Sequence, residues 1–201
     1  MRAHRQLVPG FWGKGARLGR AVLLLGAVLL LPSLEAQSGN RTEDRLLAEF
    51  IYRFARYTFW PEGARPTEGE PLVFAIVGAI PEQQTAYQAL AGRAIRDYPV
   101  KVVFEEEGWS LPLEPPWPHV LFDVQSDVLK PERTDLNPGE APVLTIVRHP
   151  RYLVEGDGVL CIYRRGDRLM FDGSLTNAAR AGLTLSSRML ALARQVHSEE
   201  E

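Results

Sequence analysis

Apolar residues recur three, four and seven positions apart in the first periodic segment of the chain. They are Leu46, Leu47, Phe50, Ile51, Phe54 and Tyr57. This spacing predicts an amphipathic helix. Asn40 and Glu43 have the spacing of a capping box, with Asn in place of Ser or Thr, so we expect the helix to begin there. It should end near Trp60, because Pro61 disfavours the helical conformation in the residue before it.

The middle of the chain holds short, continuous apolar runs in place of a helical stripe. The runs cover residues 72–78, 100–104, 119–123 and 142–147. Runs of this length are typical of strands that are buried on both faces. Short helices are predicted between them, over residues 82–90 and 126–134. The proline-rich stretch 108–118 is expected to be a surface connection.

The C-terminal part combines two strands with a longer periodic segment. Residues 159–163 and 168–171 are separated by four residues that include Gly166, which predicts an antiparallel hairpin. From Ser174, a good N-cap, small and apolar residues continue at helical spacing to Val196. One long final helix is therefore expected.

The order of these elements defines the fold class. Strands that alternate with helices indicate a single α/β domain with a mostly parallel sheet and helices on both faces. The C-terminal antiparallel hairpin and the long final helix complete it. The domain should extend from about residue 42 to 197, with an acidic tail over residues 198–201.

The N-terminal segment has the layout of a secretory signal peptide. Five basic residues precede an uninterrupted apolar run of eleven residues, 21–31. A membrane-spanning helix needs about 20 apolar residues, so an uncleaved anchor is the weaker alternative. We expect residues 1–38 to be the signal peptide, with cleavage after Ser38 or after Ala36. The remaining domain would then be exported and would not stay inserted in a membrane.

Charge and cysteine content narrow the function classes. The net charge is −2 for the whole chain, but residues 37–201 hold 18 basic and 24 acidic residues. An acidic domain argues against nucleic-acid binding, which needs clustered Lys and Arg. The single cysteine, Cys161, excludes an intramolecular disulfide and a multi-cysteine metal site. Its position inside a predicted strand favours a buried, inert thiol.

The sequence contains no recognisable catalytic motif. The histidines His119, His149 and His197 lack the spacing of a helical metal site. Ser186-Ser187 lacks the glycine pattern of a hydrolase nucleophile. We therefore predict no catalytic residues, no bound metal and no cofactor. An enzyme remains the weakest hypothesis, and it would require His149 and an acid to converge in a closed cleft.

Two groups of residues are candidates for binding. Tyr and Trp dominate binding hot spots, so the aromatic residues of the first helix are candidate partner-binding residues. These are Phe50, Phe54, Tyr57 and Trp60. Alternatively, the same stripe is the core face of the helix. Ligands of open α/β sheets bind at the carboxyl ends of the strands, so the polar loop after the fourth strand is a candidate ligand site. It contains Arg148, His149, Arg151 and Tyr152; the alternative is a solvated loop.

Three segments, in their observed order, resemble the YfiR family of exported bacterial proteins, which carry the DUF4154 domain. They are residues 50–61, 142–145 and 181–193. The resemblance implies a periplasmic, non-enzymatic regulator that binds the sensor portion of an inner-membrane diguanylate cyclase. It would repress cyclic di-GMP synthesis and thereby biofilm formation. The alternative function is a periplasmic receptor module for a small ligand.

The chain departs from the family pattern at two positions. Family members are associated with dimerisation, which makes a second copy a potential partner, and with redox-sensitive disulfides. Cys161 alone cannot form an intramolecular disulfide, so redox control of that kind is not expected. Ser174 replaces the Asn that commonly opens the last helix of the family. Both residues cap helices well.

Overall fold

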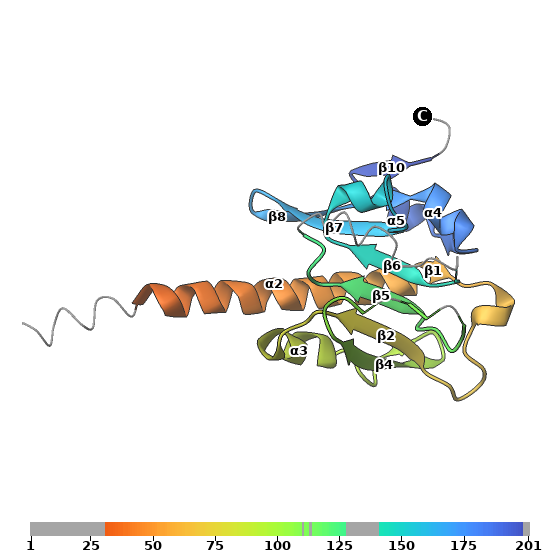
Figure 1. Ribbon diagram of the computed structural model, residues 1–201, viewed down its shortest axis with the longest axis horizontal. Helices are drawn as coiled ribbons and strands as arrows, with labels where there is room; N and C mark the ends of the chain where they lie inside the picture. The colour runs from red at the N-terminus through yellow and green to blue at the C-terminus, as the bar shows by residue number, and fades with distance from the viewer. Residues whose placement is uncertain (1–30, 110, 113, 128–140, 199–201) are drawn as a thin grey trace, which may run out of the picture. The chain divides into compact units, whose positions relative to one another are not determined.

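The structure is a computed structural model that describes residues 31–109, 111–112, 114–127 and 141–198, with the side chains of residues 31–40 left aside. The chain divides into two compact units, residues 1–40 and 41–201. The second unit contains the predicted α/β domain (Figure 1). The predicted signal peptide falls mostly outside the described residues. The same holds for the predicted helix 126–134 and for most of the acidic tail.

An eight-stranded sheet forms the centre of the domain (Figure 1). Its strands are β2 (Leu72–Val77), β3 (Ala94–Ile95), β4 (Tyr98–Glu105), β5 (Val120–Asp123), β6 (Leu144–Val147), β7 (Leu160–Arg165), β8 (Arg168–Ser174) and β10 (Gln195–His197). Their spatial order is β10-β8-β7-β6-β5-β2-β4-β3. The strands from β4 to β7 in this order are parallel, and β7 pairs with β8 antiparallel. The predicted α/β class, mostly parallel sheet and C-terminal hairpin are confirmed.

The first helix, α2 (Leu31–Arg56), is longer at its start and shorter at its end than predicted. It runs through Asn40, so the predicted capping box does not mark its first residue. It ends at Arg56 because the chain then enters strand β1 (Thr58–Phe59). The hydroxyl group of Thr58 donates to the carbonyl of Phe54 at 2.8 Å, which satisfies one of the last helical carbonyls.

The two faces of the sheet are covered differently. On one face, Phe74 and Phe122 pack against α2 and against α3 (Pro81–Gln88). Side chains of the opposite parity, such as Leu121 and Cys161, belong to a second cluster. Among the described residues, this second face is covered by loops and by the short 3₁₀ helix η3 (Pro150–Leu153). Both clusters are buried, which explains why the strands show continuous apolar runs.

The predicted long final helix is wrong. Ser174 does cap a helix, since its Oγ accepts the N–H of Asn177 at 3.2 Å, but this helix, α4 (Leu175–Arg180), is short. Three further short elements follow it in place of a continuous helix. They are β9 (Thr184–Leu185), α5 (Ser187–Leu190) and β10.

Gly182 is the physical reason for this difference. Its φ of +65° lies in the left-handed region that side-chain-bearing residues avoid. The N–H of Gly182 donates to the carbonyl of Ala179, and the N–H of Leu183 donates to Ala178. This pair of hydrogen bonds is the Schellman arrangement, which ends a helix. Gly182 therefore terminates α4.

Replacing Gly182 with alanine tests this assignment. A Cβ at this position would have its nearest contact at 3.7 Å, so Gly182→Ala should cost about 1 kcal/mol through backbone strain alone. Urea unfolding measures the loss. The matched control is Gly63→Ala, because Gly63 has neither a positive φ nor any atom near its added Cβ. An equal effect of both changes would contradict a left-handed helix terminator at Gly182.

Candidate functional site

The aromatic residues of the first candidate group divide between core and surface. Phe54 is 3% exposed, and the centre of its ring lies 4.9 Å from that of Phe171 on β8, with the two rings tilted by 56°. Phe50 is half-buried against the same cluster. Trp60 is also 3% exposed, and its Nε1 donates to the carbonyl of His119 at 3.3 Å. These three residues present little surface in this structure, and their role in partner binding stays a prediction.

Tyr57 is the exposed member of that group, and Phe59 joins it. Tyr57 is 40% exposed and Phe59 is 49% exposed. Exposed and buried side chains alternate from Tyr57, which lies in the turn after α2, to Trp60. Tyr57 and Phe59 therefore face solvent, while Thr58 and Trp60 face the core. Phe59 is absent from the predicted group because the helix was expected to extend to Trp60, and Phe59 lies off the apolar stripe of such a helix. The alternation of buried and exposed side chains from residue 57 onward is the signal that identifies it.

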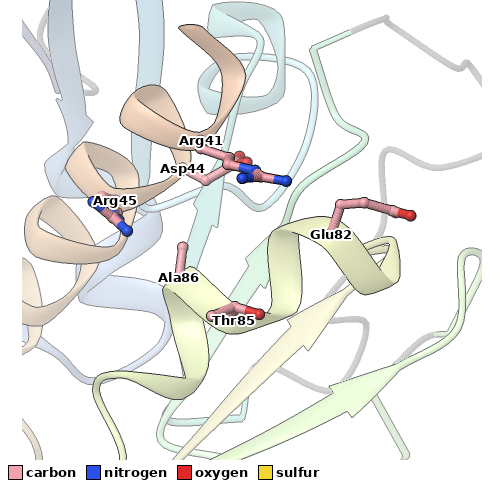
Figure 2. Close-up of a pocket in the computed structure, with 6 residues that line it drawn as sticks. All are labelled: Arg41, Asp44, Arg45, Glu82, Thr85 and Ala86. Atoms are coloured by element: carbon pink, nitrogen blue, oxygen red, sulfur yellow. The ribbon is translucent and has the colours of Figure 1, made fainter. Parts of the chain in front are cut away.

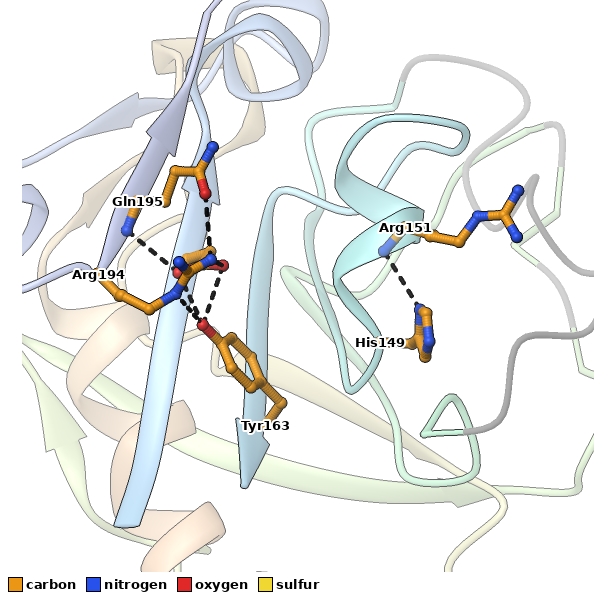
Figure 3. Close-up of polar contacts among 6 residues, drawn as sticks. His149, Arg151, Tyr163, Arg194 and Gln195 are labelled. Atoms are coloured by element: carbon orange, nitrogen blue, oxygen red, sulfur yellow. Dashed lines mark hydrogen bonds and ion pairs between the residues drawn. The ribbon is translucent and has the colours of Figure 1, made fainter. Parts of the chain in front are cut away.

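The second candidate group lies at the carboxyl end of β6, as predicted, and its side chains are held by neighbouring groups. His149 accepts the N–H of Arg151 through Nδ1 at 3.2 Å and thereby caps η3 (Figure 3). Arg151 forms an exposed ion pair with Glu155 at 2.6 Å. Tyr152 is 1% exposed. A ligand-binding role for these residues stays a prediction.

Arg148, the first residue of this group, takes part in an ion-pair network at the carboxyl end of the sheet. The two oxygens of the Glu43 carboxylate bind Arg148 at 2.8 Å and Arg164 at 2.5 Å. Burial raises the pKa of Glu43, but hydrogen bonds and charges from both arginines outweigh it, so this pKa lies below its ordinary value. Glu43 thus fastens α2 to β7 and to the residue that follows β6. Sequence reasoning assigned Glu43 only to a cap.

A hollow of about 280 Å³ lies between α2 and α3, next to this network. Its lining residues are Arg41, Asp44, Arg45, Glu82, Thr85 and Ala86. Figure 2 shows Arg41 and Asp44 reaching from α2 over α3. Burial raises the pKa of Asp44, although a hydrogen bond from Gln83 at 3.2 Å opposes the shift. The hollow carries both charge signs in equal number, so its charge favours neither an anion nor a cation.

Gln125 bridges the carboxyl ends of β2 and β5, where this type of sheet usually binds ligands. The strand order β4-β2-β5-β6-β7 changes direction between β2 and β5, and ligands commonly bind beyond the carboxyl ends at such a point. The amide of Gln125 donates to the carbonyl of Gly78 at 3.0 Å. A Cβ on Gly78 would lie 2.8 Å from Gln125 Cγ, so glycine permits this close approach. A hollow of about 320 Å³ remains beside this contact, and its lining includes Gly78, Gln125 and the acidic residues 105–107.

A polar cluster around Asp172 connects the C-terminal strand β10 to the sheet (Figure 3). Asp172 on β8 is fully buried and receives hydrogen bonds from Arg194 at 2.7 Å and from the backbone N–H of Gln195 at 3.1 Å. The hydroxyl of Tyr163 also donates to it. These contacts hold β10 beside β8. The cluster is therefore part of the framework of the domain.

The groups that could perform chemistry are also engaged or buried. His119 Nδ1 accepts the N–H of Val73 at 3.1 Å, and burial lowers the pKa of its imidazole. Cys161 is fully buried, and burial raises the pKa of its thiol. A protonated, inaccessible thiol is unreactive. Within the described part of the chain, no cluster of three or more His, Cys, Asp or Glu side chains could hold a metal ion.

The fold and these contacts define an α/β domain whose polar groups mainly connect its own elements. None of the helices in the described ranges combines the length and the apolar character of a membrane span. A family model described as YfiR/HmsC-like, DUF4154, matches residues 44–194. The chain belongs to this family. A comparison with curated proteins gave no match.

The family defines the general role of the chain. YfiR/HmsC-like proteins are typically exported, and they are generally non-enzymatic regulators. Their regulatory partners belong to diguanylate cyclase systems. The matched range begins at Asp44 in α2 and ends at Arg194, directly before β10. It therefore includes the exposed Tyr57 and Phe59, and it leaves out Arg41, Glu43 and Gln195.

The Glu43 network predicts acid-sensitive stability. Glu43→Gln should cost about 2 kcal/mol at neutral pH, because one partly buried carboxylate holds two guanidinium groups. Since folding lowers the pKa of Glu43, its contribution is present above the unfolded value of 4.5 and is lost as the pH falls through the folded value. Urea unfolding of wild type and variant from neutral pH to below pH 4.5 should therefore show converging stabilities.

The control for this prediction is Glu49→Gln on the same helix. Glu49 pairs with Arg93 at 2.5 Å, but its side chain is 48% exposed, so its loss should cost less than about 1 kcal/mol. Equal losses from both variants, or a Glu43→Gln effect that does not change with pH, would contradict the network as described.

The Asp172 cluster predicts a second stability effect. Asp172→Asn removes a buried charge from beside Arg194 and should cost about 3 kcal/mol in urea unfolding. Hydrogen exchange should accelerate in β10 first. The matched control is Asp167→Asn in the exposed hairpin turn, which should be nearly neutral. Unchanged protection of Val196 in Asp172→Asn would show that other contacts hold β10.

Proposed function

We propose that this protein is a periplasmic, non-enzymatic repressor of an inner-membrane diguanylate cyclase. It binds the sensor portion of the cyclase and keeps cyclic di-GMP synthesis low, which limits biofilm formation. The observation that carries the proposal is the family match over residues 44–194, which extends from α2 to the residue before β10. The repressor performs no reaction itself.

The N-terminal segment supports the periplasmic location. The basic leader and the apolar run 21–31 precede Arg41, where the second compact unit of the chain begins. Cleavage after Ser38 or Ala36 would leave that unit intact. The proposal therefore combines a signal peptide over residues 1–38, removed on export, with a binding domain over residues 42–197.

The surface of the domain supports a binding role. Tyr57 and Phe59 expose large aromatic rings at the end of α2. Exposed aromatic residues of this kind contribute much of the energy of protein–protein interfaces. At the usual ligand position of such a sheet, Gln125 bridges β2 and β5, so the support for a protein partner comes from the exposed rings at the other edge. Homodimerisation is compatible with this role.

Deletion of the gene tests the proposed function. Cyclic di-GMP, measured by mass spectrometry of cell extracts, should rise severalfold in the deletion strain, and wild-type complementation should restore it. A second complementing gene without codons 2–38 should fail, because the domain would remain in the cytoplasm, away from the sensor portion of the cyclase. Unchanged cyclic di-GMP after deletion would disprove the proposal. Restoration by the leaderless gene would disprove the periplasmic site of action.

A further inference from the structure

Strands β1 and β9 form a two-stranded antiparallel ribbon with one aromatic, solvent-facing side. Thr58 pairs with Leu185, and Phe59 pairs with Thr184. The N–H of Ser186 donates to the carbonyl of Tyr57 at 3.0 Å, which extends the pairing by one residue. Thr58 and Leu185 are buried, whereas Tyr57, Phe59 and Thr184 are exposed. The ribbon thus has a core face and a solvent face that carries Phe59, and the exposed Tyr57 directly precedes it.

Arg96 lies over one of these rings in a strained backbone conformation. It occupies the two-residue turn between β3 and β4, and its φ is +54°, a value that glycine adopts far more readily. Its guanidinium lies 4.6 Å from the centre of the Phe59 ring and donates to the carbonyl of Thr58 at 3.1 Å. Strain of this kind is concentrated at functional sites.

The surroundings of the ribbon are basic in a domain that is acidic as a whole. A hollow of about 320 Å³ beside Phe59 is lined by Arg65, Arg96 and one acid, Asp97. Arg56 is exposed next to Tyr57, and Arg188 is exposed shortly after β9. Arginine beside exposed aromatic rings is the composition of a binding hot spot, and its charge is complementary to carboxylates.

We infer that the aromatic face of the β1–β9 ribbon, together with Arg96, binds a carboxylate-bearing segment of the cyclase's sensor portion. The inference rests on the proposed function and assigns the surface that performs it. The rings supply the apolar contact area. The Arg96 guanidinium is held over Phe59 by its hydrogen bond to Thr58, and it binds the carboxylate with its remaining N–H donors. A membrane surface fits less well, because interfacial binding uses a long amphipathic helix, whereas this face is a short ribbon beside a hollow.

Complementation of the deletion strain tests the surface. Arg96→Gly and the double variant Tyr57→Thr, Phe59→Thr should each weaken repression, corresponding to about a tenfold loss of affinity per hot-spot change. Arg96→Gly should also unfold at the same or a higher temperature than wild type, because glycine removes the strain. The matched control is Leu192→Thr, which alters a 78%-exposed apolar residue elsewhere and should repress normally.

Photocrosslinking in living cells gives a second readout. A photoreactive benzoylphenylalanine at position 59 should crosslink the full-length protein to a diguanylate cyclase, and the same group at position 192 should not. A crosslink at position 59 only to a second copy of this chain would overturn the inference. Binding of the purified protein to anionic phosphatidylglycerol vesicles through Phe59, without a protein crosslink, would overturn it as well.

The two proposals can fail separately. If deletion raises cyclic di-GMP and the ribbon variants still restore repression at normal protein levels, the assigned surface is wrong and the repressor function stands. If deletion leaves cyclic di-GMP unchanged, the proposed function is wrong and the inference fails with it. Loss of repression with a lowered unfolding temperature in Arg96→Gly would assign the residue to folding and overturn its binding role.

Discussion

The carboxylate of Glu43 fixes the position of α2, and much of the domain depends on that position. By binding Arg148 and Arg164, it joins the helix to two neighbouring strand regions that are more than 100 residues away in sequence. The apolar face of α2 then covers one side of the sheet. The end of α2 at Arg56 determines where β1 begins. The first residue of β1 in turn determines which side chains of the strand point to the core and which aromatic rings face solvent. A single, partly exposed ion-pair network thus contributes to the orientation of the exposed Tyr57 and Phe59.

The strands could be predicted from the sequence because burial on both faces leaves a continuous apolar run, which needs no tertiary information to recognise. The helix ends could not. Phe54 and Tyr57 continue the helical spacing beyond Arg56, and what ends the helix is pairing with β9, an element more than 120 residues away. In the C-terminal region, small residues at helical spacing predict one long helix, whereas the chain forms α4, β9, α5 and β10. Only the backbone hydrogen bonds around Gly182 show that this glycine ends a helix and is not one more small residue within it.

Only part of the candidate site could be predicted, because the rest depends on where the first helix ends. An aromatic segment with an interaction role can be inferred from composition, but the division into core rings and exposed rings follows the alternation of an extended segment. Phe59 was therefore missed, while Trp60, its neighbour, is buried. The placement of Arg96 carries no local signal, since the turn it occupies lacks the Asn-Gly or Gly pattern that marks such turns. The contact between Glu43 and Arg148 cannot be predicted from local spacing either, because the two residues are 105 positions apart in the sequence.

The position of the ribbon relative to the sheet bears on how this domain binds. The hollow beside Phe59 is lined by Leu72 and Tyr98, the first residues of β2 and β4, so it lies at the amino ends of the parallel strands. Small-molecule sites of such sheets lie at the opposite, carboxyl ends, and there Gln125 bridges β2 and β5 beside a hollow of about 320 Å³. The carboxyl edge thus holds contacts between elements, through Glu43 and Gln125, whereas the amino edge has exposed aromatic and basic groups. These exposed groups suit recognition of another protein, because aromatic and arginine side chains supply much of the binding energy of protein interfaces.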